Sequence, residues 1–107
     1  MEIDYDIDDA LNVLYNIKNN PYGIKNTNHS IFRTRDRSIN QDLIFKKINE
    51  DKPVGIEKDA SSSSRFLLIY EYTKFRDLAI AIDILNEIQL PRPVEVVDCE
   101  LFSQSTS

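Results

Sequence analysis

Apolar residues in the first part of the chain recur at the spacing of an amphipathic helix. This pattern predicts a helix from residue 8 or 9 to about residue 19. Its apolar stripe is formed by Ala10, Leu11, Leu14 and Ile17. The acidic residues at its start match the positive end of the helix dipole. Pro21, which follows two asparagines, ends the helix because proline cannot donate the next backbone hydrogen bond.

The residues before this helix alternate between acidic and apolar and have two interpretations. Ile3, Tyr5 and Ile7 would share one face of a short strand over residues 2–8, because side chains in a strand alternate between faces. The same residues also fit an acidic lead into the helix. A further strand is predicted over residues 30–37.

A second helix is predicted from residue 38 to about residue 50. Ser38 and Gln41 have the S-x-x-Q spacing of a capping box, in which each side chain accepts a hydrogen bond from the other's backbone N–H. The buried stripe of this helix is expected to be Leu43, Ile44 and Ile48. Pro53 closes the segment.

Four consecutive serines precede the most hydrophobic part of the chain. Residues 59–64 offer little to bury and are predicted to form a flexible loop. The next strand, over residues 65–73, is continuously apolar from Phe66 to Tyr70, as expected for a central strand that is covered on both faces.

Residues 74–89 are interpreted as a helix. Leu78, Ile82, Leu85 and Ile88 form one stripe, and further apolar residues widen it. A last strand is predicted over residues 94–102. Its alternation slips by one position, which predicts a β-bulge near Val96 and Val97.

Together these elements predict an α+β or α/β fold. A single domain over residues 1–102 would pack about three helices on a mixed sheet of about four strands, ending in a strand–helix–strand unit. Residues 103–107 are expected to form a frayed polar tail.

Charge narrows the classes of partner. The 107 residues carry a net charge of −5, and the isoelectric point is near 4.8. An acidic surface repels nucleic-acid phosphates and anionic membranes, and it speeds encounter with basic proteins. Without a basic, apolar leader or a span of apolar residues, a cytoplasmic protein is expected.

The polar clusters give no catalytic signature. Asp4, Asp6 and Asp8 have the spacing that opens a calcium loop, but the glycine and glutamate that the loop requires at later positions are missing. His29 is expected on the surface, and the single cysteine, Cys99, in the core. These two residues provide too few ligands for a metal site. We therefore expect no cofactor, no metal and no enzymatic activity.

Three arginines are the one predicted anion site. Arg33, Arg35 and Arg37 would project from one strand face, and guanidinium groups bind phosphate or carboxylate in a bidentate manner. A solvated face paired with the chain's own acids is the favoured interpretation of these arginines, and contact with a protein partner is another. With Lys46 and Lys47 they would support the alternative function, a nucleic-acid-binding regulator.

The functional expectation is a small, acidic, non-catalytic protein-binding module. It would act either as an inhibitor or immunity-type protein, with a basic toxin or nuclease as partner, or as a subunit or adaptor of a larger complex. The residues expected to bind the partner are Glu2, Asp4, Asp6, Asp8, Asp9, Asp36, Glu50 and Asp51.

Overall fold

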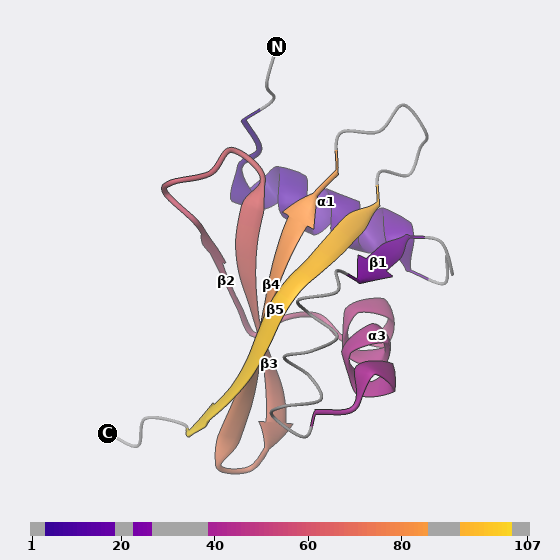
Figure 1. The fold of residues 1–107 in the computed structure, drawn as a ribbon, viewed down its shortest axis with the longest axis vertical. Helices are drawn as coiled ribbons and strands as arrows, with labels where there is room; N and C mark the ends of the chain where they lie inside the picture. Colours follow the sequence, from indigo (N-terminus) through magenta and orange to yellow (C-terminus); the bar gives the residue numbers. More distant parts are fainter. Residues whose placement is uncertain (1–3, 19–22, 27–38, 86–92, 104–107) are drawn as a thin grey trace.

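The fold is α+β, with two helices and a five-stranded mixed sheet among the described residues (Figure 1). The computed structural model describes residues 4–18, 23–26, 39–85 and 93–103. The helices are α1 (Ile7–Ile17) and α3 (Gln41–Glu50). The strands are β1 (Ile24–Asn26), β2 (Gly55–Lys58), β3 (Arg65–Thr73), β4 (Arg76–Ile84) and β5 (Val94–Ser103).

Strands β3, β4 and β5 form an antiparallel meander in the middle of the sheet. The strand order is β1-β5-β4-β3-β2. Strand β2 pairs antiparallel to β3, whereas the short β1 pairs parallel to the beginning of β5. Only the β1–β5 pair makes the sheet mixed, so most of its register is set by hairpin-like connections between sequence neighbours.

The helix predicted over residues 74–89 is wrong, because residues 76–84 form strand β4. Leu78, Ile80, Ile82 and Ile84 are buried on one face. The residues between them are acidic or small and lie on the opposite face. Leu78 and Ile82 fit a helical stripe as well, but the strict alternation and the three β-branched isoleucines favour a strand. The C-terminal unit is therefore strand–strand–strand, and residues 86–89 lie outside the described part.

The first helix confirms the acidic-lead interpretation of the N-terminus. Helix α1 begins at Ile7, so the strand predicted over residues 2–8 is wrong at its described end. Helix α3 is also confirmed, but its N-cap is Asn40 rather than Ser38. The Asn40 side chain accepts a hydrogen bond from the Asp42 backbone N–H at 2.9 Å. Ser38 and the strand predicted over residues 30–37 lie outside the described residues.

Both helices bury their apolar stripes in one core with the sheet. Ala10, Leu14 and Ile17 of α1 and Ile44 and Ile48 of α3 belong to this core. From the sheet it takes Phe66, Leu68, Tyr70, Leu78, Ile80, Ile82, Ile84, Val94, Val96 and Cys99. Figure 1 shows α1 crossing behind β4 and β5. The sheet therefore has an inner face, which carries these core residues, and an opposite outer face.

The predicted β-bulge is confirmed in β5. Ile82 pairs with Val96 and the adjacent Ala81 pairs with Asp98, so Val97 is the extra residue. The insertion lets Val94 and Val96 before it, and Cys99 after it, all point into the core. The burial predicted for Cys99 is thereby confirmed.

Tyr70 is a polar exception within the core. Its side chain is 1% exposed, and its hydroxyl has no hydrogen-bond partner among the described residues. Burial raises the pKa of Tyr70 well above its ordinary value, and the nearby negative charge of Asp51 adds to this shift. The phenol therefore stays neutral, and its desolvated hydroxyl lowers the stability of the core.

Replacing this hydroxyl should not destabilise the protein. We expect Tyr70→Phe to leave the free energy of unfolding in urea unchanged or to raise it by about 1 kcal/mol, because the variant removes an unpartnered buried polar group. Tyr15→Phe is the matched control, since Tyr15 is 73% exposed, and it should have no effect. A loss of more than about 1 kcal/mol in Tyr70→Phe would show that the hydroxyl is hydrogen bonded in solution.

Candidate protein-binding face of the sheet

The outer face of the sheet has a layout fixed by strand pairing. Residues paired across neighbouring strands point to the same side of the sheet. Along β4, every second residue from Asp77 to Asp83 lies on the outer face. The pairs define four rows across the sheet. From one end to the other, the rows are Glu71–Asp77–Phe102, Gly55–Ile69–Ala79–Glu100, Glu57–Leu67–Ala81–Asp98 and Arg65–Asp83–Glu95.

The centre of the outer face is apolar. Leu67 and Ile69 come from β3, and Ala79 and Ala81 from β4; we refer to these four residues as the apolar strip. Ala79 is 7% exposed, and the other three are half-buried. Two shallow hollows of about 310 and 290 Å³ lie on this face and share Leu67 and Ala81 in their lining.

Acidic residues surround the apolar strip. The outer face carries seven strand carboxylates, from Glu57, Glu71, Asp77, Asp83, Glu95, Asp98 and Glu100. Two cationic residues of the strands lie on the same face, Arg65 of β3 and Lys25 of β1. Lys25 lies beside Glu95 of β5 in the strand register. Within the described part of the chain, no ion pair is made by Glu57, Glu71, Glu95 or Glu100. We call these four residues the glutamate rim. The field of this face is therefore negative, so it attracts cations.

Arg65 is held at one end of the face. Its guanidinium donates to both carboxylate oxygens of Asp83, from Nε at 3.3 Å and from Nη2 at 2.8 Å. This hydrogen bonding raises the pKa of Arg65 above its ordinary value, and the charges of Asp59 and Glu95 add to the shift. Asp83 thus holds the guanidinium in bidentate geometry, and its carboxylate balances the charge of Arg65 at this end of the face.

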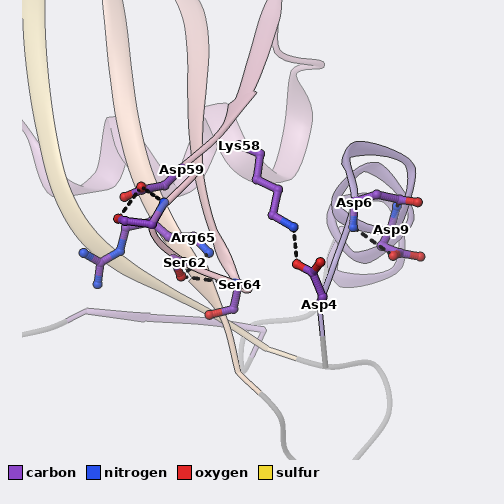
Figure 2. A network of polar contacts seen from close by, with 9 residues as sticks. Asp4, Asp6, Asp9, Lys58, Asp59, Ser62, Ser64 and Arg65 are labelled. Carbon is purple, nitrogen blue, oxygen red and sulfur yellow. Dashed lines mark hydrogen bonds and ion pairs between the residues drawn. The ribbon is translucent and has the colours of Figure 1, made fainter. Parts of the chain in front are cut away.

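The Ser-rich loop lies next to Arg65 and is built from short-range hydrogen bonds (Figure 2). The carboxylate of Asp59 accepts from the Ser61 backbone N–H at 2.9 Å and from its hydroxyl at 2.6 Å. The Ser62 hydroxyl accepts from the backbone N–H groups of Ser64 and Arg65, both at 3.1 Å. These bonds give the serines a structural role. The flexibility predicted for residues 59–64 stays a prediction.

The N-terminal aspartates predicted to bind a partner lie on the other side of the sheet. Asp6 and Asp9 form a reciprocal capping box: each side chain accepts from the other's backbone N–H, at 2.8 and 3.0 Å. Figure 2 shows Lys58 reaching toward Asp4 on the side of α1, with the guanidinium of Arg65 on the opposite side. The structure thus gives three of these carboxylates a role in anchoring α1.

The remaining predicted site residues are placed in part. Asp8 is exposed in the first turn of α1, and Glu50 is exposed at the end of α3. Asp51 follows α3 and pairs with Lys47 at 3.0 Å. Predicted residues outside the described part are Glu2, His29, Arg33, Arg35, Asp36 and Arg37. The partner-binding role of the acidic residues and the anion site therefore stay predictions.

Comparison with protein-family models, curated proteins and solved structures gave no match. The described residues contain no group of three or more histidine, cysteine, aspartate or glutamate side chains placed to hold a metal ion. Neither described helix is long and apolar enough to cross a membrane.

Sequence reasoning missed the outer face because it interpreted β4 as a helix. The signal was nevertheless in the chain. Aspartate or alanine occupies every second position from Asp77 to Asp83, and aliphatic residues fill the positions between. Period two with one apolar face and one polar face is typical of a strand that has only one face in the core.

The capping box makes a prediction about stability. Replacing Asp6 with alanine leaves backbone N–H groups of α1 unsatisfied, so we expect the free energy of unfolding to fall by about 1 kcal/mol. Asp8→Ala is the control: Asp8 lies in the first turn but makes no capping bond, and its loss should cost only a few tenths of that. Urea denaturation measures both. Equal losses would mean that general charge, rather than capping, stabilises the start of α1.

The Ser-rich loop makes a prediction about pH. Hydrogen bonds from the side chain and the backbone N–H of Ser61 hold the pKa of Asp59 below its ordinary value. The lowered pKa means that the charged form stabilises the folded state at pH values above the unfolded pKa, and that this stabilisation is lost as pH falls through the folded pKa.

We therefore expect Asp59→Asn, which keeps an acceptor but not the charge, to be less stable than the wild-type protein at pH 7. The difference should disappear in acid, once Asp59 is protonated. Chemical denaturation as a function of pH measures it. A difference in stability that stays constant with pH would contradict the assignment of the effect to the carboxylate charge.

Proposed function

We propose that the chain is a small, non-catalytic protein-binding module that docks a basic partner on the outer face of its sheet. It acts as an inhibitor or immunity-type protein, or as a subunit of a larger complex. The observation that carries the proposal is the apolar strip surrounded by carboxylates on the face opposite both helices. Apolar contact supplies affinity at the centre, and the acidic surround steers and orients a basic partner.

The chemistry of this face favours a protein over a small anionic ligand or a nucleic acid. Phosphate groups would meet seven strand carboxylates and two strand cations, one of which is engaged by Asp83. Nucleic-acid affinity depends on cations that displace counterions, and this face provides the opposite charge. A patch with an apolar centre and a charged rim is instead the arrangement found at protein–protein interfaces.

The test is affinity capture from the host lysate with three versions of the tagged protein. The first is wild type. The second neutralises the glutamate rim (Glu57→Gln, Glu71→Gln, Glu95→Gln and Glu100→Gln). The third neutralises acids on the helix side of the sheet (Asp8→Asn, Glu50→Gln and Asp51→Asn). Comparing these two variants shows which of the two acidic surfaces binds the partner. Both variants keep Asp6 and Asp9, whose carboxylates cap α1.

We expect one basic protein to be retained by the wild type and by the helix-side variant, and to be lost from the rim variant by about tenfold or more. Purified partner should then bind in a fixed stoichiometry. If it is an enzyme and the module is an inhibitor, an equimolar amount should block its activity. Retention by the rim variant with loss from the helix-side variant would reject the outer face and restore the acidic residues predicted around α1 and α3.

A further inference from the structure

The outer face is hollowed over the middle of β4, and we refer to this hollow as the channel. Its floor is formed by Ala79 and Ala81, whose side chains are the smallest in their rows apart from Gly55. On one side it is lined by Leu67 of β3, and Ile69 is the next residue of β3 on the same face. The other wall is formed by residues of β5, because the 310 Å³ hollow over the alanines is also lined by Asp98, Glu100 and Phe102.

The dimensions of this channel match one α-helix. Neighbouring strands lie about 4.8 Å apart, so the backbones of β3 and β5 are about 10 Å apart, and one helix, about 10 Å across, can span from one to the other. From Asp77 to Asp83 the strand advances by about 20 Å, the length of about 13 helical residues. A helix lying along β4 would therefore contact all four rows of the outer face.

Other occupants fit the face less well. An added strand binds a sheet through the backbone groups of an edge, whereas the channel lies over the central strand. A second copy of this chain would bring two strongly acidic faces together, and like charges repel. A flat sheet would need a wider apolar surface than the four residues of the apolar strip provide.

The two walls differ in charge, and this difference specifies the partner further. The β3 wall is aliphatic over the middle two rows, whereas the β5 wall carries Glu95, Asp98 and Glu100. An amphipathic helix would meet the first wall with apolar side chains at i, i+3, i+4 and i+7. It would meet the second wall with lysine or arginine residues on the adjacent flank.

We propose that the occupant of the outer face is an amphipathic helix of the basic partner, seated along β4 over Ala79 and Ala81, with its cationic flank against β5. This inference rests on the proposed function and specifies which element of the partner is bound. It requires both the hollow over the alanines and the glutamates of β5, and a separate variant can alter each of them.

The experiment uses a fluorescent helical peptide of about 15 residues, with leucines at helical spacing and lysines on one flank. The helical peptide has one proline, at its first position, where a helix tolerates it. A second peptide of the same composition and charge has this proline in the centre, where it disrupts the helix. Binding to the full chain is measured by fluorescence anisotropy at low ionic strength. We expect the helical peptide to bind about tenfold more tightly than the interrupted one and to gain helical circular dichroism.

Two variants test the channel, with a third as control. Ala81→Leu should fill the floor and weaken binding by about tenfold, and Glu95→Gln with Glu100→Gln should weaken it to a similar degree. The control, Glu50→Gln with Asp51→Asn, should bind as wild type does. Thermal unfolding of each variant confirms that it is folded before binding is compared.

The outcomes separate the helix from the docking face. Equal binding of both peptides, no binding of either, or full binding to Ala81→Leu would overturn the helical occupant. The docking face would still stand if the captured partner remained sensitive to the glutamate rim. Loss of that sensitivity would overturn the proposed function together with this inference.

Discussion

Strand β4 is the constraint on which the rest of the structure depends. It lies between β3 and β5, so both of its edges are occupied and its side chains have only two directions to take. Leu78, Ile80 and Ile82 point inward and are fully buried in the core that the two helices share. The intervening residues are thereby committed to the outer face. Core and candidate docking surface are consequently two faces of one strand, and a slip by one residue would exchange them.

Two groups of acidic residues in the described part of the chain have different roles. Around α1, the carboxylates of Asp6 and Asp9 satisfy backbone donors, and Asp4 pairs with Lys58. The Tyr5 backbone N–H also donates to the Ser63 carbonyl at 2.8 Å, which joins the start of α1 to the loop before β3. The four glutamates of the rim make no such contacts among the described residues. The net charge of the chain does not distinguish the two groups, because it counts carboxylates that bond within the fold together with those of the glutamate rim.

Local signals in the sequence predicted much of the fold. Helical spacing located α1 and α3, the apolar run located β3, and the broken alternation located the bulge in β5. These features depend on neighbouring residues, which are visible in one chain. The third predicted helix failed because Leu78 and Ile82 satisfy both periodicities, and only the pairing of β4 with two other strands decides between them. Propensity is a weak guide where tertiary contacts compete with it.

The candidate site was less predictable than the fold for the same reason. The outer face combines Glu57, Glu71 and Glu100 from three strands, and their proximity follows from register rather than from sequence spacing. When residues 74–89 are interpreted as a helix, Ala79 and Ala81 belong to its apolar stripe and are expected in the core rather than on a surface. Acidic composition did indicate a basic partner, but composition assigns no position to the charges. The aspartates at the N-terminus form a cluster that is visible in the sequence, whereas the glutamates of the outer face are far apart in the sequence.

The bulge at Val97 also governs the thiol chemistry of the chain. In a regular strand of the same sequence that continued the alternation of Val94 and Val96, Asp98 and Glu100 would enter the core and Cys99 would face solvent. The one extra residue reverses this pattern, and the single cysteine is left 2% exposed opposite Ile80. A buried thiol is hard for oxidants and for other thiols to reach. One irregular backbone position therefore places the thiol of Cys99 inside the core instead of on the surface.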